Sequence, residues 1–202
     1  MPDLDFKKQY KDLYAPSAKQ FVIVEVPTFQ FLMIDGQGDP NTSKEYQAAL
    51  EALYNVSYTL KFTLKKEGGP IYKVPPLEGL WWAEDMSNFV DLPKSAWNWT
   101  MIIAQPDFIK ASQVKSTIAE LVIKKPNPAL HKLRFEKFAE GKAAQIMHVG
   151  PYSAEGPTIA KMHIFIKEQG YKPRGKHHEI YLGDPRRTAP AKLRTVLRQP
   201  VG

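Results

Sequence analysis

The two halves of the chain show the same order of sequence patterns, and this internal repeat limits the possible fold more than any single motif does. In the first half, FLMIDGQGDP precedes a helical pattern and the strand-like run GPIYKVPPLEGLWW. In the second half, AQIMHVGPYS precedes a helical pattern and KHHEIYLGDP. Each half therefore reads as strand, turn, helix, strand, strand. This repeat predicts an α+β fold, in which duplicated strand-helix-strand-strand modules form one antiparallel sheet with helices on one side and pseudo-twofold symmetry.

Apolar periodicity and turn residues place the individual elements. Residues 1–20 are expected to be an N-terminal extension with a helical turn over residues 6–14, and residues 21–202 a single domain of two repeats, about 21–104 and 105–202. Helices are predicted from Ser43 into the low sixties, behind a capping box formed by Thr42 and Glu45, from Pro106 to before Pro126, and around residues 159–170. Strands are predicted at 21–26, 29–34, 70–74, 77–84, 97–104, 133–140, 143–149, 177–182 and 193–198.

Composition and charge exclude several classes of function. The chain has no cysteine, so disulfides, thiolate zinc sites and cysteine nucleophiles are excluded. No apolar run approaches the roughly 18 residues needed to span a bilayer, and the N-terminus lacks a signal-peptide pattern, which predicts a cytoplasmic protein without a membrane partner. Residues 172–202 hold eight Lys or Arg against two acidic residues, +6 of the formal charge of +7. A basic tail is often a solvated surface, and without a known nucleic-acid-binding motif no nucleic-acid partner is expected.

Metal and cofactor motifs are also missing. His177 and Glu179 would share one face of a strand, and His148 could approach from a neighbouring strand, but no HExxH or similar ligand spacing is present. The Gly36-Gln37-Gly38 turn lacks the remaining glycines and the lysine of a phosphate-binding loop, and there is no GxSxG motif. The sequence therefore predicts neither a metal nor a cofactor.

The run KHHEIYL contains the strongest candidate for a binding wall. In a strand, alternation would turn His178, Ile180 and Leu182 to one face, under a helix. His177, Glu179 and Tyr181 would then share the opposite face, where a carboxylate lies between two rings. Alternation alone leaves open whether this face lines a pocket or is an ordinary exposed polar surface.

Tryptophans and a turn tyrosine could complete such a pocket. Trp81 and Trp82 are adjacent and would point to opposite faces of a strand, whereas Trp97 and Trp99 would share one face. Some of these indoles must be core residues, but rings around one carboxylate would form a site for a flat, apolar or cationic molecule. Tyr152, at the end of a predicted strand, could reach over the sheet or simply pack in its turn.

Four motifs in order resemble the stand-alone GyrI-like small-molecule-binding proteins. They are PPLEGLWW (75–82), WNWTMIIAQP (97–106), MHVGPYSAEGPTI (147–159) and HHEIYLGDPRRT (177–188), and the similarity extends from about Asp5 to Val201. In related domains, which serve as drug-sensing halves of transcription regulators, a pocket glutamate meets cationic ligands, and Glu179 matches that glutamate. No DNA-binding domain is recognised in the sequence, so a one-chain transcription regulator is not expected.

The resemblance also implies a reaction. A subset of the family with the LEGLWW and HHEIYL motifs hydrolyses cyclopropanoid DNA-alkylating toxins of the yatakemycin and duocarmycin type. The resemblance implies catalytic roles for Glu179 and Tyr152 and no cofactor. The ligand-binding residues expected around them are Trp81, Trp82, Tyr181, Trp99 and His177. The expected partner is a flat aromatic small molecule, bound either for hydrolysis or for sequestration or sensing, and both a monomer and a homodimer are compatible with the sequence.

Overall fold

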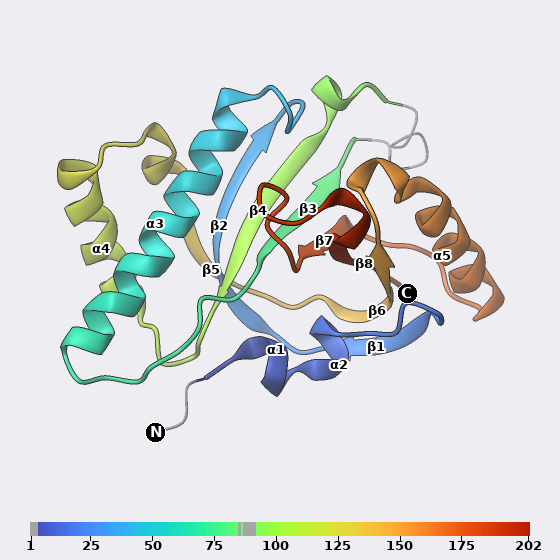
Figure 1. Cartoon of the computed structure of the whole chain (residues 1–202), viewed down its shortest axis with the longest axis horizontal. Coiled ribbons are helices and arrows are strands. Elements are labelled where there is room, and N and C mark those ends of the chain that lie inside the picture. Colours follow the sequence, from blue (N-terminus) through green and yellow to red (C-terminus); the bar gives the residue numbers. More distant parts are fainter. Residues whose placement is uncertain (1–3, 85, 87–91) are drawn as a thin grey trace.

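A single eight-stranded antiparallel sheet forms the centre of the computed structural model, which describes residues 4–84, 86 and 92–202 (Figure 1). The strand order is β1-β6-β8-β7-β3-β4-β2-β5. The strands are β1 (Val22–Val26), β2 (Phe29–Gln37), β3 (Leu77–Trp82), β4 (Asn98–Gln105), β5 (Arg134–Phe138), β6 (Gly141–Val149), β7 (His177–Tyr181) and β8 (Arg194–Pro200). The predicted α+β fold with one antiparallel sheet is confirmed.

The order of strands displays the predicted pseudo-twofold relation. β3 and β7 pair at the centre, and on either side the order continues as β4-β2 in the first repeat and β8-β6 in the second. The outer strands are exchanged between repeats: β1 leads into β2 but pairs with β6, whereas β5 leads into β6 but pairs with β2. This exchange ties the two repeats into one sheet.

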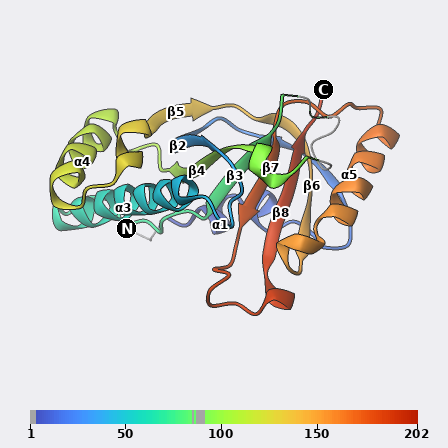
Figure 2. The same cartoon turned by 90° about the horizontal axis from the view of Figure 1, so that it is seen from above.

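The longer helices pack on one face of the sheet, which we call the helical face (Figure 2). They are α3 (Lys44–Lys66), α4 (Ala111–Lys124) and α5 (Gly156–Glu168). α3 and α4 share a core with β2, β3 and β4, and α5 forms a separate core with β6 and β8. The central β3–β7 pair therefore lies between two helix-covered halves.

The opposite face, which we call the second face, is covered by the N-terminal segment. The short helices α1 (Phe6–Gln9) and α2 (Lys11–Tyr14) place Phe6, Leu13 and Tyr14 in a core with Leu80 and Ile180. The helical cover predicted over the His178 side of β7 is thus supplied by the N-terminal extension.

Several predicted elements differ locally from the structure. Residues 70–74 form no strand; Tyr72 makes only an isolated bridge with Leu4. The cap of α3 is Ser43, not Thr42, because the Ser43 hydroxyl accepts a hydrogen bond from the Tyr46 amide at 3.2 Å. α4 begins at Ala111 rather than at Pro106. These differences lie in connecting segments, where three-dimensional packing rather than periodicity decides the boundary.

Short 3-10 helices lie in the connections between the main elements. They do not add to the sheet. They are η2 (Lys94–Ala96), η3 (Pro128–Lys132), η4 (Tyr152–Ala154) and η5 (Pro190–Lys192).

Candidate functional site

An apolar row on the helical face is interrupted where the two repeats meet. Directly paired residues on neighbouring strands point to the same face, so the register defines which side chains adjoin. The row that crosses the middle of the sheet is Ile34, Met101, Gly79, Glu179, Leu197 and Ile146. Its ends belong to the cores under α3 and α5. At its centre a glycine and a carboxylate replace the apolar side chains, which is typical of a binding site rather than of a core.

Glu179 is held by a chain of two hydrogen bonds. The Tyr181 hydroxyl donates to Glu179 Oε2 at 2.8 Å, and Trp81 Nε1 donates to the same hydroxyl at 3.0 Å. The Glu179 side chain is only 15% exposed. Burial, followed by the charge of Glu179, raises the pKa of Tyr181 well above its usual range, so this phenol stays protonated and continues to donate.

Gly79 makes room for this arrangement. A β-carbon at this position would lie 2.8 Å from Trp81 Nε1 and 3.0 Å from the Tyr181 hydroxyl. A β-carbon does not approach another atom as closely as 2.8 Å, and 3.0 Å is tighter than most β-carbon contacts, so any larger residue would displace the two groups that hold Glu179. The glycine in LEGLWW is therefore part of the site although it has no chemistry of its own.

His177 and Glu179 occupy the same face of β7. His177 Nε2 lies 3.5 Å from Glu179 Oε1, and His177 is nearly fully buried. Neither ring nitrogen has a hydrogen-bond partner among the described residues. A buried imidazole with both nitrogens unpaired can accept or donate a hydrogen bond to a molecule that reaches Glu179.

Glu155 is a second buried carboxyl group beside Glu179, and the sequence analysis missed it. It is 4% exposed at the start of α5, and its Oε1 has no hydrogen-bond partner among the residues that the structure describes. Burial, followed by the charge of Glu179, raises the pKa of Glu155 to about 9. Glu155 therefore keeps its proton at neutral pH.

Aromatic rings surround this pair of carboxyl groups. Tyr152 packs edge-on against Tyr181 with ring centroids 5.5 Å apart, and it is 38% exposed. Burial, together with Glu155 and Glu179, raises its pKa to about 12. Tyr46 of α3 lies 6.1 Å from the Trp81 ring, and burial and the charge of Glu179 raise its pKa above the usual range. We refer to Glu179, Glu155, His177 and the rings of Trp81, Tyr46, Tyr152 and Tyr181 as the Glu179 cluster.

The sequence matches a known protein family over most of its length. The model of the GyrI-like small molecule binding domain matches residues 19–201. The chain belongs to the GyrI-like family. No curated protein matched the sequence in a separate comparison.

Crystal structures of similar proteins support the assignment of the GyrI-like fold. An uncharacterized conserved protein from Listeria innocua is 40% identical, with a TM-score of 0.90 over 99% of this chain and 100% of that chain. A hydrolase from Listeria innocua is 39% identical, with a TM-score of 0.87 over 99% of this chain and 100% of that chain. The EcmrR C-terminal domain is 12% identical, with a TM-score of 0.57 over 91% of this chain and 97% of that chain, and shares only the fold.

Two of the predicted ligand-binding tryptophans do not join the Glu179 cluster of this GyrI-like domain. Trp82 points to the second face, as its alternation with Trp81 requires, and Lys176 Nζ lies 3.3 Å from the centre of its ring. Trp99 is fully buried, and its indole lies where a β-carbon of Gly36 would be, 2.1 Å from the nearest ring atom. The Trp99 ring packs edge-on against Tyr46, with ring centroids 5.2 Å apart. Trp99 therefore positions a ring of the cluster and is not itself exposed to it.

The second face of the GyrI-like sheet contains a buried network of charges that the sequence analysis did not predict. His178 lies between two carboxylates, with Nε2 2.9 Å from Glu78 Oε2 and Nδ1 2.9 Å from Glu140 Oε1. Arg198 donates to Glu140 Oε2 at 3.0 Å and to the Leu13 carbonyl at 2.9 Å, which fixes the N-terminal segment to the sheet. Two cations thus balance two carboxylates in the interior.

Charges shift the ionisation of this network in opposite directions. Burial alone would lower the pKa of His178, but Glu140 and Glu78 raise it to about 9. Burial alone would raise the pKa of Glu140, but His178 and Arg198 lower it to about 2. Both groups are therefore charged at neutral pH, and the network is structural rather than a store of exchangeable protons.

No group of three or more His, Cys, Asp or Glu side chains in the described part of the chain is arranged to hold a metal ion. Over the same residues, no helix is both long and apolar enough to cross a bilayer.

Proposed function

We propose that this GyrI-like domain hydrolyses electrophilic cyclopropanoid toxins of the yatakemycin and duocarmycin type, by ring-opening addition of water at the Glu179 cluster. The observation that supports this most is the pairing of Glu179, fixed by the Tyr181 hydroxyl at 2.8 Å, with the protonated Glu155. The 39% identity to a Listeria innocua protein described as a hydrolase is consistent with an enzymatic role.

The proposed reaction needs one base and one acid. These toxins contain a strained cyclopropane conjugated to a dienone. Water attacks the ring methylene, a carbon–oxygen bond forms, and the bond from the methylene to the spiro carbon breaks. Its electron pair moves through the dienone to the carbonyl oxygen, which becomes a phenol oxygen. One proton leaves the water, and one proton must reach the phenol oxygen, so no cofactor is required.

Glu179 is suited to the role of base. Its Oε2 accepts from Tyr181, which leaves Oε1 on the side of His177 to orient and deprotonate a water molecule. Glu155 and Tyr152 are suited to donate to the developing phenolate, since the raised pKa values of both groups keep their protons in place at neutral pH. The Trp81 and Tyr181 rings provide flat surfaces for an aromatic substrate.

Glu179→Gln tests the role of the base. The amide keeps the size of the side chain and can still accept from Tyr181, but it cannot take a proton from water. We expect turnover of a duocarmycin-type substrate to fall by at least about a hundredfold, a typical contribution of general base catalysis, while the dissociation constant of an unreactive analogue changes little. Glu168→Gln, on the exposed end of α5, removes the same charge and should retain activity. Full ring-opening activity of Glu179→Gln would refute the assignment.

A second candidate function is binding without turnover. A carboxylate among aromatic rings is also a receptor for a cationic or aromatic molecule, as in sequestration or sensing. Mass spectrometry of the toxin distinguishes the two functions. A water adduct formed at substoichiometric protein supports hydrolysis, whereas recovery of the intact toxin after denaturation supports sequestration.

A further inference from the structure

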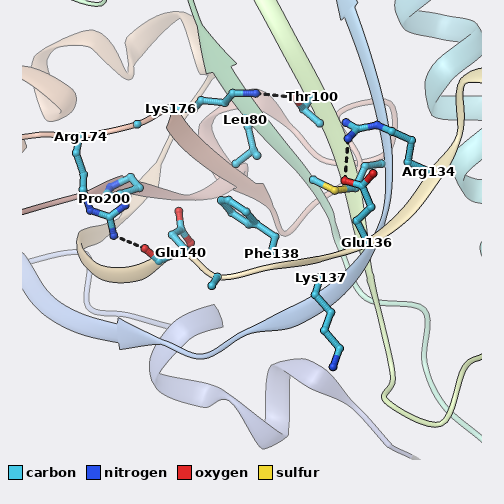
Figure 3. A pocket seen from close by; sticks show the side chains of 13 residues that line it. Leu80, Thr100, Arg134, Glu136, Lys137, Phe138, Glu140, Arg174, Lys176 and Pro200 are labelled. Atoms are coloured by element: carbon cyan, nitrogen blue, oxygen red, sulfur yellow. Dashed lines mark hydrogen bonds and ion pairs between the residues drawn. The ribbon is translucent and has the colours of Figure 1, made fainter.

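A cavity of about 360 Å³ lies on the second face of the sheet. Figure 3 shows Arg174, Lys176 and Phe138 among the side chains that line it. Leu80 and Thr100 line it, and these residues alternate along their strands with Trp81 and Trp99 of the helical face. The cavity volume lies within the range of small-molecule sites, roughly 300–1,000 Å³. It is therefore large enough for a ligand of its own.

Two cations at the cavity have no carboxylate partner among the described residues. Arg174 donates from Nε to the Val201 carbonyl at 3.0 Å and from a terminal nitrogen to the Glu140 carbonyl. Three of its five N–H groups remain available. Lys176 donates to the Thr100 hydroxyl at 3.1 Å and lies over the Trp82 ring. Both side chains are held in position by neutral groups, and Asp35, which accepts from the Thr100 hydroxyl at 2.7 Å, offsets only part of the Lys176 charge.

The acidic groups nearby are already occupied. Glu140 lines the cavity, but its two carboxylate oxygens are bound to His178 and Arg198. Arg134 binds Glu136 at 2.8 Å and Asp35 at 2.7 Å. Glu140 is thus balanced by cations of its own, whereas Asp35 and Glu136 share Arg134. Arg174 and Lys176 add two further positive charges at the cavity, so positive charge is in excess there.

The surroundings of Lys176 favour a bound anion. Burial lowers its pKa; Asp35, the next largest influence, opposes this effect, and Arg134 adds to it. An anion would offset the lost hydration of the ammonium group. Apolar side chains of Met33, Leu80 and Phe138 line the same cavity and can cover a non-polar body.

We propose that this cavity is a second ligand site, which binds a small organic anion whose carboxylate or phosphate head lies between Arg174 and Lys176 while a compact apolar body packs on Leu80 and Phe138. The site is independent of the proposed hydrolysis, because the Glu179 cluster lies on the other side of the sheet. Its chemistry is also the opposite: cations on the second face and carboxyl groups on the helical face.

Calorimetric titration with 2-naphthoate, its neutral analogue 2-naphthamide and inorganic phosphate tests the proposal. We expect 2-naphthoate to bind and phosphate to compete with it, whereas the amide should bind at least about tenfold more weakly, as the loss of a charge-assisted contact predicts. Added salt should weaken the binding of naphthoate. No binding of naphthoate, or equal binding of the amide, would overturn the proposal.

Variants locate the binding site. Lys176→Gln and Arg174→Gln should each reduce naphthoate affinity by about tenfold, and Lys176→Arg should retain most of it because the charge is kept. Lys66→Gln, an exposed residue at the end of α3, removes the same charge elsewhere and should bind normally. Unchanged naphthoate affinity in both Lys176→Gln and Arg174→Gln would place the anion elsewhere and refute the second site.

Discussion

Replacing Glu155 by Gln should stabilise the protein at neutral pH, although it alters a residue of the candidate site. Burial and the charge of Glu179 raise the pKa of Glu155 from 4.5 to about 9. The unfolded chain releases this proton above pH 4.5, whereas the folded protein keeps it up to about pH 9. The unfolded state therefore binds fewer protons in this interval, and the free energy of unfolding falls as the pH rises through it.

The magnitude follows from the width of the interval. A pH of 7 lies about 2.5 units above the pKa of Glu155 in the unfolded chain. At about 1.4 kcal/mol per unit, ionisation of the unfolded chain lowers the free energy of unfolding by roughly 3 kcal/mol. At pH 5 the same calculation gives less than about 1 kcal/mol. A Gln side chain has nearly the same shape and no proton to lose, so Glu155→Gln should lack this pH dependence.

Urea unfolding of both proteins at pH 5 and pH 7 measures the effect. Burying the amide destabilises Glu155→Gln by the same amount at both pH values. The informative quantity is therefore how the difference in unfolding free energy between the variant and the wild type changes from pH 5 to pH 7. We expect this difference to shift by roughly 2–3 kcal/mol in favour of Glu155→Gln between pH 5 and pH 7. Glu168→Gln serves as an exposed control with no shift. Parallel stability profiles of the wild type and Glu155→Gln would refute the protonated state of Glu155 and its proposed role as an acid.

Three further predictions test the fold and the two faces of the sheet. Gly36→Ala should destabilise the protein by about 3 kcal/mol or more in thermal or urea unfolding, because the new methyl group would overlap the rigid indole of Trp99. Trp81→Leu should weaken binding of a flat aromatic ligand at the Glu179 cluster, measured by fluorescence titration, whereas Trp82→Leu should not. The contribution of His178 should be complete below pH 6.5 and be lost as the pH rises through about 9, so the stability difference between wild type and His178→Gln should shrink in alkaline urea titrations.

The internal repeat made most of the architecture predictable. Two copies of a strand-helix-strand-strand pattern led to one antiparallel sheet with pseudo-twofold symmetry, and alternation along β7 separated Glu179 from His178 correctly. The exchange of β1 and β5 between the repeats was not predicted. It depends on which edge strand of the sheet β1 and β5 pair with. The local sequence pattern of a short strand does not specify its pairing partner.

The candidate site was predictable only in part, for a related reason. Glu179, Tyr181 and Trp81 follow from alternation along two strands that the family resemblance had already marked. Glu155 is different, because in the sequence it is one polar residue in a turn before Gly156. Its raised pKa arises from burial and from the charge of Glu179, 24 residues away along the chain. The sequence indicates only that Glu155 precedes a helix, and an acidic residue at that position is usually exposed and interacts with the helix N-terminus.

The basic C-terminal region acquires a different meaning once its side chains are placed. The sequence analysis interpreted residues 172–202, which hold nearly all of the excess charge, as a solvated surface. Arg198 is instead 3% exposed and neutralises Glu140 in the interior. Arg174 and Lys176 are directed at one cavity by carbonyl and hydroxyl groups. Three of the eight cations thus have fixed positions on a single face of the sheet, and this favours recognition of a small anion over diffuse contact with a polyanion.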